Sequence, residues 1–309
     1  MTGGREAALF DDVPCIIAET STLTTRPGVE CALYKWRPPS PGSGRIRGIA
    51  VVYHGFGAHS LYPTVRYASS LLAENGLMVY GLDLPGHGAS PGMRGLLTCV
   101  EDMINDGIAV AQYAARENVG DGGEEGVPLF LVGSSMGGAI ALAVANRMPS
   151  SAVSGVVMLA PMLSLNVGSG SRMALGWLNA IVPLLPIIPS SATRPELQYR
   201  DKERRAECER NTLTYKGKLR PQSALTCIEF TTQIQQSFHE VTVPFLCMIA
   251  DEDVVVDNSM ARELMGKSPS KDKTLKSYAA LHGLLCEPAP LLGIIEDDFV
   301  QWVLERCPR

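Results

Sequence analysis

The chain has 309 residues, of which 46% are hydrophobic and 19% are charged, and its formal net charge at pH 7 is −5. This balance is typical of a globular protein with a full apolar core, and it argues against intrinsic disorder. An acidic chain offers no overall basic surface to a phosphate backbone, which excludes nucleic acid as an expected partner.

The eight cysteines lie apart from one another, without a Cys-x-x-Cys pair or a histidine at metal-ligand spacing. We therefore expect free thiols in a reducing compartment and no metal site. The N-terminal residues contain no continuous apolar segment and no Arg-rich amphipathic pattern. They therefore predict no secretory or transit signal, and a cytoplasmic location.

Short apolar runs rich in β-branched residues predict buried parallel strands. In chain order these runs lie at residues 49–53, 77–82, 129–132, 156–159 and 245–249. Stretches of helical length separate them, such as 64–74 and 101–117. This alternation predicts an α/β architecture, a mostly parallel central sheet flanked by helices.

The alternation stops after Pro161 and resumes near Val243. We interpret residues 162–240 as an inserted cap, and residues 1–161 with 241–309 as one core. The apolar segment 173–189 is interrupted by prolines and too short for a comfortable membrane span of about 20 residues. The stretch 193–220 is basic, with nine Lys or Arg against five Asp or Glu.

The most specific motif is Gly-Ser-Ser-Met-Gly at 133–137, between an apolar run and a helix of small residues. Gly-x-Ser-x-Gly in a strand-to-helix turn is the signature of a nucleophile elbow. The two glycines flank Ser135 symmetrically and do not flank Ser134, so Ser135 is the candidate nucleophile. The alternative is an ordinary glycine-rich turn.

A serine hydroxyl needs a neighbouring base, and the chain offers five histidines. The chain order of nucleophile, acid and base in this type of fold excludes His54, His59 and His87. His239 precedes the late strand that should carry the acid. His282, which follows a predicted strand at 274–278, is therefore the candidate general base.

The acid should lie in a loop just beyond a strand, where it can orient the histidine. Asp251, Glu252, Asp253 and Asp257 all follow the run at 245–249 closely enough. Periodicity does not choose among them, and a solvated acidic turn is an equally simple interpretation.

Two backbone N–H groups should stabilise the oxyanion of the transition state. One comes from the residue after the nucleophile, Met136. The other is expected from the loop after the strand at 49–53, where His54-Gly55 would present the N–H of Phe56. A glycine turn with an incidental histidine is the alternative there.

Segments spread over nearly the whole chain resemble the monoacylglycerol lipase and lysophospholipase branch of the α/β-hydrolases, which carries a serine aminopeptidase S33-type hydrolase domain. The resembling segments are HGFGAHS (54–60), LDLPGHGASPGMRG (82–95), GSSMGGAIAL (133–142), NTLTYKGKLR (211–220), TVPFLCMIADEDVVVD (242–257) and KTLKSYAALHGLLCE (273–287). The family pattern Gly-x-x-Asp-x-Val falls on 250–255, which selects Asp253 as the acid and leaves Asp251 second.

The resemblance implies a cofactor-independent serine esterase. Its substrates would be monoacylglycerols or similar single-chain acyl esters such as lysophospholipids, cleaved to fatty acid and alcohol through an acyl-enzyme. One alternative is a carboxylesterase for small or phenolic acyl esters. Another is a ligand-binding protein without catalysis on the same fold.

The apolar part of the cap suggests a lipid-facing entrance. Lipid contact would make the protein peripheral at membranes, because an apolar helix face dips into the headgroup boundary and neighbouring cations favour anionic lipid. Packing on the core is the alternative. The residues expected to line the entrance are Trp177, Leu178, Ile181, Leu184 and Leu185.

Overall fold

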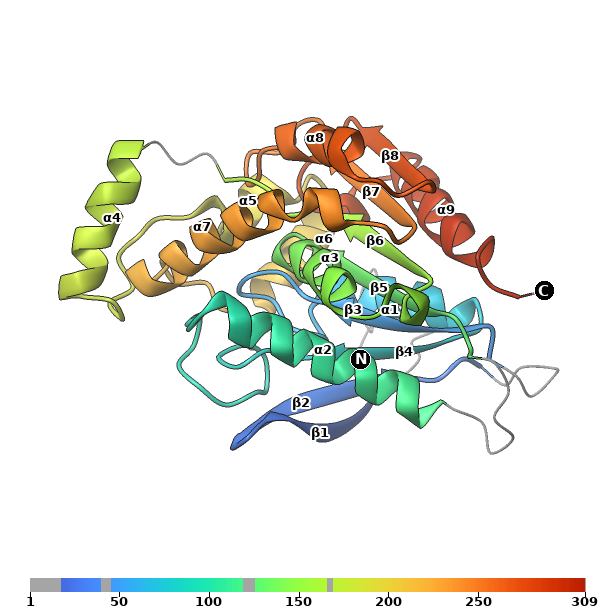
Figure 1. Ribbon diagram of the computed structural model, residues 1–309. Helices are drawn as coiled ribbons and strands as arrows, with labels where there is room; N and C mark the ends of the chain where they lie inside the picture. Colours follow the sequence, from blue (N-terminus) through green and yellow to red (C-terminus); the bar gives the residue numbers. More distant parts are fainter. Residues whose placement is uncertain (1–17, 40–45, 119–125, 166–168, 309) are drawn as a thin grey trace, which may run out of the picture.

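The computed structural model describes residues 18–39, 46–118, 126–165 and 169–308 (Figure 1). Its centre is an eight-stranded sheet with the strand order β1-β2-β4-β3-β5-β6-β7-β8. The strands from β4 to β8 in this order pair in parallel, while β1 and β2 are antiparallel. The strands are β1 (Glu19–Arg26), β2 (Val29–Trp36), β3 (Gly48–Tyr53), β4 (Leu77–Leu82), β5 (Leu129–Ser134), β6 (Gly155–Leu159), β7 (Phe245–Ala250) and β8 (Lys273–Tyr278).

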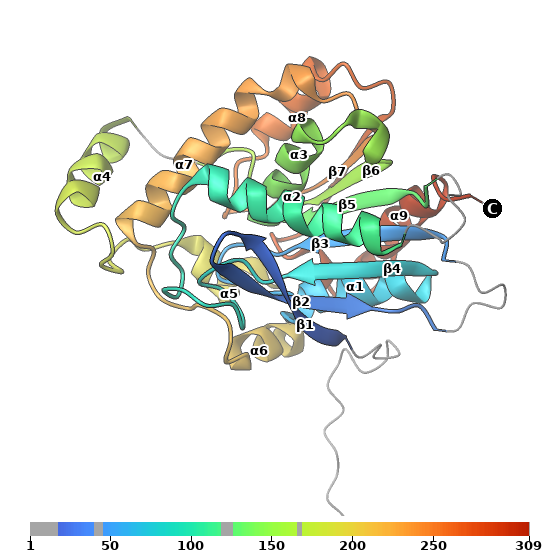
Figure 2. The ribbon, with the colours of Figure 1, turned by 60° about the horizontal axis from the view of Figure 1, so that its bottom comes forward.

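Helices cover both faces of the sheet, which confirms the predicted α/β class. One face packs against α1 (Pro63–Glu74) and α9 (Leu291–Leu304). The other packs against α2 (Val100–Glu117), α3 (Met136–Arg147) and α8 (Ser259–Lys267) (Figure 2). Because alternate residues of a strand face opposite sides, the central strands must be apolar throughout. Every residue of β3, β4, β6 and β7 is buried.

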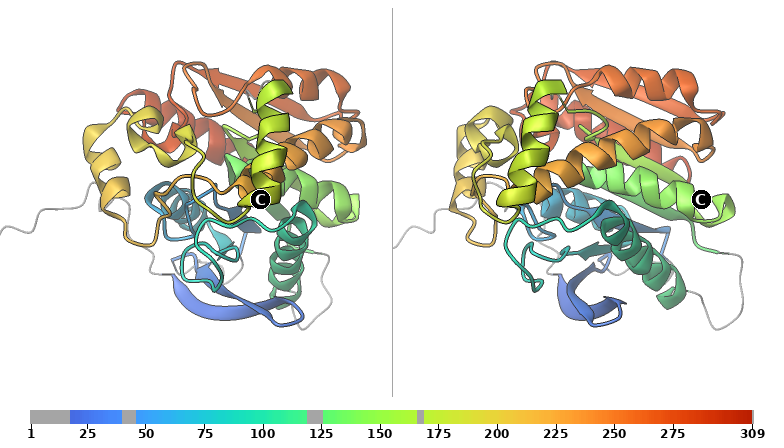
Figure 3. Two further views of the ribbon diagram at one scale, coloured as in Figure 1. Left: turned by 90° about the vertical axis from the view of Figure 1, so that its left-hand side faces the viewer. Right: turned by 60° about the vertical axis from the view of Figure 1, so that its left-hand side comes forward.

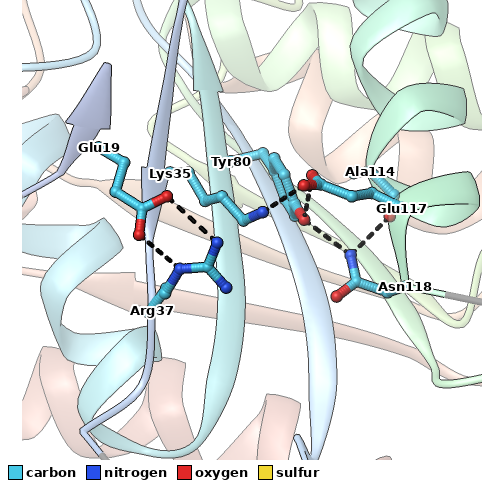
Figure 4. Close-up of polar contacts among 7 residues, drawn as sticks. All are labelled: Glu19, Lys35, Arg37, Tyr80, Ala114, Glu117 and Asn118. Atoms are coloured by element: carbon cyan, nitrogen blue, oxygen red, sulfur yellow. Dashed lines mark hydrogen bonds and ion pairs between the residues drawn. The ribbon is translucent and has the colours of Figure 1, made fainter. Parts of the chain in front are cut away.

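The antiparallel hairpin of β1 and β2 was absent from our sequence prediction, because β1 is polar and mostly exposed. Side chains connect this edge to α2 (Figure 4). Lys35 of β2 pairs with Glu117 at the end of α2. The same carboxylate accepts a hydrogen bond of 2.8 Å from the hydroxyl of Tyr80. The side-chain amide of Asn118 in turn donates a hydrogen bond of 2.8 Å to that hydroxyl. These contacts hold the hairpin against the main sheet.

The chain between β6 and β7 forms α4 (Ser169–Ile181), α5 (Pro195–Gln198), α6 (Lys202–Arg210) and α7 (Pro221–Gln236). Figure 3 shows α4 beside α7 and away from the sheet. Leu175 of α4 packs there on Ala224 and Ile228 of α7. Further along α7, Phe230 and Ile234 belong to the main core. The helix thus joins both regions, and the assignment of 162–240 as a cap stays a prediction.

Short 3-10 turns complete the described elements. They are η1 (Ser150–Ala152), η2 (Ser191–Thr193), η3 (Phe238–Glu240) and η4 (Leu284–Cys286). None of the helices in the described ranges is long and apolar enough to cross a membrane. The seven cysteines within those ranges are free, whereas Cys15 lies outside them.

Candidate active site

Ser135 occupies the sharp turn between β5 and α3, with φ 55° and ψ −121°. This backbone conformation is costly for a residue with a side chain, by about 1 to 3 kcal/mol, and such strain concentrates at functional sites. The flanking glycines permit the turn. A Cβ on Gly133 would lie 2.1 Å from the carbonyl oxygen of Gly137, and one on Gly137 would lie 2.0 Å from that of Tyr53.

His282 is positioned by a buried carboxylate. Its Nδ1 lies 2.7 Å from Oδ2 of Asp253, whose side chain has no exposed surface. Oδ1 of Asp253 accepts the N–H groups of Val255 at 2.7 Å and Val256 at 3.1 Å. Since an ionised carboxylate only accepts hydrogen bonds, the proton of the neutral imidazole is on Nδ1, and Nε2 has a free lone pair.

The other acids of the same loop make different contacts. Asp251 is exposed and accepts the hydroxyl of Ser277. Glu252 pairs with Arg200, which comes from the predicted cap. Asp257 accepts hydrogen bonds from the backbone N–H and the side-chain hydroxyl of Ser259. In the part of the chain that the structure describes, Asp253 is the one acid of this loop whose carboxylate contacts an imidazole.

Burial explains why two other histidines are unsuited to act as the base. Nε2 of His54 accepts the N–H of Leu84 at 3.0 Å, and its Nδ1 lies 2.8 Å from the carbonyl oxygen of Gly55. Burial lowers the pKa of His54 to about 4 and that of His87 to about 3. Both imidazoles are neutral structural groups that support the loop after β3.

The remaining two histidines contact other residues and line neither cavity that reaches Ser135. Nε2 of His59 lies 2.9 Å from Oδ1 of Asn211, a residue of the predicted cap. The side chain of His239 is 73% exposed and lies 3.8 Å from Glu240. His282, by contrast, lines a cavity together with Ser135.

Ser135 lies where two cavities meet. The inner cavity, of about 70 Å³, is lined by Ser135 and His282 and by polar groups including Tyr62, Thr193 and Tyr199. No hydrogen bond joins Ser135 to His282 in this structure. Such contacts are often long in a free enzyme and shorten once substrate is bound.

The second cavity, here called the cap cavity, has a volume of about 520 Å³ and also reaches Ser135. Its wall is predominantly apolar and comes mainly from α4, α7, the segment that joins them and the loops after β6 and β7. The apolar lining residues include Leu175, Leu178, Ile188, Leu219, Ile228 and Val254. A cavity of this size and character accommodates a ligand with a long apolar part.

The two residues expected to supply the oxyanion donors are both near Ser135 in the structure. Met136 is the first residue of α3, and Phe56 follows β3 in the loop that approaches Ser135. A Cβ on Gly55 would lie 3.3 Å from Cβ of Ser135, so this loop passes close to the nucleophile. The ring of Phe56 packs edge-on against His87 and Tyr215, which fixes the loop.

Of the five cap residues expected to line an entrance, Leu178 lines the cap cavity. Trp177, Ile181, Leu184 and Leu185 instead face solvent, with exposures from 45% to 74%. The sequence analysis missed Tyr62, Tyr199 and Tyr215 of the inner cavity. No local motif marks any of the three, and Tyr199 and Tyr215 lie in the charged stretch 193–220 of the predicted cap. Across the described ranges, no group of His, Cys, Asp or Glu side chains is arranged to hold a metal ion.

The chain is similar to several known proteins. Human monoglyceride lipase is 26% identical over 277 residues, covering 88% of this chain and 86% of its own. A monoacylglycerol lipase of Mycolicibacterium smegmatis is 27% identical over 280 residues, which cover 90% of this chain and 94% of that protein. The structure of a soluble variant of Saccharomyces cerevisiae monoglyceride lipase in complex with a substrate analogue superposes with a TM-score of 0.82. The two sequences are 20% identical, and the superposition covers 96% of this chain and 98% of the yeast chain.

A family model described as serine aminopeptidase, S33, matches residues 44–289. The matched region contains the predicted nucleophile elbow, the loops with Asp253 and His282, and all of the segment between β6 and β7. The chain therefore belongs to the serine aminopeptidase S33 family of α/β-hydrolases.

Proposed function

We propose that the protein hydrolyses the ester bond of monoacylglycerols or closely similar single-chain acyl esters. The observation that carries this proposal is the position of Ser135, which opens both to a large apolar cavity and to a small cavity whose wall includes several hydroxyl groups. A long acyl chain fits the large cavity, and a small alcohol fits the small one. The two monoacylglycerol-cleaving relatives support the same substrate class.

In the proposed reaction, Oγ of Ser135 attacks the ester carbonyl while Nε2 of His282 takes its proton. Asp253 holds Nδ1–H of the imidazole and stabilises the imidazolium that forms. His282 then protonates the departing alcohol, which leaves an acyl group on Ser135. Water, deprotonated by the same histidine, releases the fatty acid and regenerates the serine.

The N–H groups of Phe56 and Met136 are proposed to bind the oxyanion. Met136 begins α3, so its N–H is one of the unpaired donors at a helix N-terminus, where the helix dipole also favours negative charge. Removal of one oxyanion donor costs about 3 kcal/mol of transition-state stabilisation in a comparable hydrolase. These donors are backbone groups, so the fixed geometry of both loops determines their contribution.

The size of the inner cavity favours a glycerol head group over a phosphocholine group. Its volume is about 70 Å³, and the hydroxyls of Tyr62 and Tyr199 are paired at 2.8 Å in its wall. A small alcohol with several hydroxyls matches such a wall. A bulky charged head group would require the predicted cap to move.

We also propose that α4 contacts lipid surfaces. Trp177 and Ile181 are 70% and 74% exposed on this helix. Large exposed apolar side chains grouped on one helix indicate a partner or membrane surface. The predicted cap also carries the basic stretch 193–220, which is attracted to anionic lipid.

A panel of substrates with one acyl chain and different head groups tests the proposal. We expect kcat/KM to be highest for 1-monoacylglycerol, lower for lysophosphatidylcholine, and low for feruloyl esters and an aminoacyl p-nitroanilide. Ser135→Ala should abolish all turnover. A clear preference for the phenolic ester or the anilide would reject the monoacylglycerol proposal while leaving the nucleophile in place.

A further inference from the structure

Arg200 extends from the predicted cap to both loops that carry the proposed acid and base. It lies between α5 and α6, and its Nη2 is 3.1 Å from Oε1 of Glu252. Its Nε is 3.0 Å from Oε2 of Glu287. Glu252 directly precedes Asp253, and Glu287 follows His282 by five residues. One guanidinium group therefore contacts the acid loop and the base loop together.

Glu287 is an unusual partner because its side chain is only 1% exposed. Its Oε1 accepts the N–H of Leu281 at 2.7 Å, and Leu281 directly precedes His282. Burial raises the pKa of Glu287, whereas the hydrogen bond from Leu281 and the charge of Arg200 lower it. Oε2 of Glu287 accepts no hydrogen bond of good geometry from the described residues. Among these residues, the positive charge of Arg200 is therefore what stabilises this buried oxygen.

The same segment of the predicted cap also touches the base loop through its backbone. The N–H of Gly283 donates to the carbonyl oxygen of Gln198 at 2.9 Å. A Cβ on Gly283 would lie 2.3 Å from the ring of Tyr199. The residue after His282 is therefore packed directly against the segment that ends in Arg200.

The acid loop and the base loop also contact each other near Arg200. The N–H of Glu252 donates to the carbonyl oxygen of Ala280 at 3.1 Å. Nη2 of Arg200 lies 3.4 Å from the carbonyl oxygen of Ala279. The guanidinium thus lies over the junction of the two loops rather than on one of them.

We propose that Arg200 is a positioning residue for catalysis: by binding Glu252 and Glu287 together, it fixes the turn that presents His282 to Asp253 and Ser135. This inference rests on the proposed triad and adds to it a contact made from the predicted cap. Without Arg200, Glu287 would be a buried carboxylate without a counter-charge, which is strongly unfavourable. The turn at Leu281 and His282 would then move to let that carboxylate reach water.

The proposal makes a specific prediction about a compensating substitution. Glu287→Gln removes the charge but retains an oxygen that can accept the N–H of Leu281. A neutral amide at this position no longer needs Arg200. The damage caused by Arg200→Gln should therefore be relieved by Glu287→Gln, although each substitution removes one more polar contact.

The experiment measures wild type, R200Q, E287Q and R200Q/E287Q on p-nitrophenyl butyrate, a short soluble ester. The rate of labelling by a fluorophosphonate gives a second measure of nucleophile activation. Arg194→Gln is the matched control, because Arg194 lies in the same segment and its ion-pair partner among the described residues is the exposed Glu196, at 2.8 Å. The downfield proton NMR signal of the His282 Nδ1–H reports the contact with Asp253.

We expect R200Q to lower kcat and the labelling rate about 10- to 100-fold, as small displacements of catalytic groups do, with KM nearly unchanged. The NMR signal should broaden or disappear in R200Q and return in R200Q/E287Q. The double variant should recover most of the lost kcat, a non-additivity typical of residues in contact. R194Q should match wild type in kcat and labelling rate.

The proposal is overturned if R200Q and R194Q have equal kcat and labelling rates, or if E287Q fails to relieve R200Q. Should R200Q not fold, R200K replaces it, because one ammonium group cannot bind both carboxylates as the guanidinium does. A wild-type kcat in R200K would also reject the role. Failure of the triad itself looks different, since the fluorophosphonate would then label S135A as well as wild type.

Discussion

The carboxylate of Asp253 is fully buried and lies 2.7 Å from Nδ1 of His282. Asp253→Asn should lower kcat by about 10⁴-fold, because the amide no longer fixes the required tautomer and no longer stabilises the imidazolium. Steady-state kinetics on a short ester measure this effect.

Asp251→Asn is the matched control for that substitution. Asp251 is exposed and contacts Ser277, so its replacement should change kcat less than twofold, as surface substitutions generally do. Equal losses in the two variants at equal thermal stability would contradict the assignment of Asp253 as the orienting acid.

The adjacent serines 134 and 135 provide a second matched pair. Ser135→Ala should lower kcat by about 10⁴- to 10⁶-fold and prevent labelling by a fluorophosphonate, whereas Ser134→Ala should leave both nearly unchanged. Intact-protein mass spectrometry detects the label directly. A labelled S135A protein would show that another residue is the nucleophile.

Stability should fall with decreasing pH because of two buried histidines. Their pKa values are lowered from 6.5 to about 4 for His54 and about 3 for His87. Between these values and 6.5 the unfolded state binds more protons, so stability is lost as the pH falls. Each histidine should contribute a loss of about 2 kcal/mol between pH 7.5 and pH 5.

Urea unfolding at the two pH values measures this loss, and His54→Gln supplies the comparison. The variant should be less stable at pH 7.5, because the N–H of Leu84 loses its ring-nitrogen partner. It should also lose less additional stability at pH 5 than wild type does. An unchanged pH dependence in the variant would mean that His54 is not the group that titrates.

The exposed and cavity-facing sides of α4 predict different phenotypes. Trp177→Ser with Ile181→Ser should weaken binding to anionic vesicles about 10-fold or more and reduce turnover of long-chain monoacylglycerol in those vesicles. Turnover of a short soluble ester should be unchanged. Flotation of the protein with vesicles, alongside both assays, measures these effects.

Ala174→Trp provides the complementary variant, because Ala174 lines the cap cavity from an exposed position on the same helix. It should reduce long-chain turnover without weakening vesicle binding. If the Trp177 and Ile181 substitutions lowered activity on both kinds of ester and left vesicle binding intact, α4 would be a packing element rather than a lipid contact.

Much of the fold could be predicted from sequence because the buried strands are continuous apolar runs. The predicted strand 77–82 agrees with β4, and 129–132 with the apolar part of β5. The hairpin of β1 and β2 could not be predicted in the same way. Its first strand, ETSTLTTR, is polar, and it is positioned by backbone pairing with β2 and by Arg26, which pairs with Asp102 and Asp106 of α2.

Part of the candidate site could likewise be predicted from the sequence, and part could not. The turn around Ser135 is a local motif with steric requirements, so the sequence alone identifies it. Periodicity left the acid open and only the resemblance to the family pattern selected Asp253, because the choice depends on which carboxylate meets His282, 29 residues further along the chain. Arg200 and Glu287 are 87 residues apart and give no sequence signal before the fold brings them together.

The dependence of kcat/KM on acyl chain length tests the central claim most directly. For 1-monoacylglycerols of increasing length, each methylene buried in the cap cavity should raise kcat/KM about fourfold, corresponding to about 0.8 kcal/mol, until the cavity is filled. We predict a steep rise followed by a plateau at long chains. A flat profile, or a maximum at the acetyl ester, would contradict the assignment of this protein as a hydrolase of long-chain monoacyl esters.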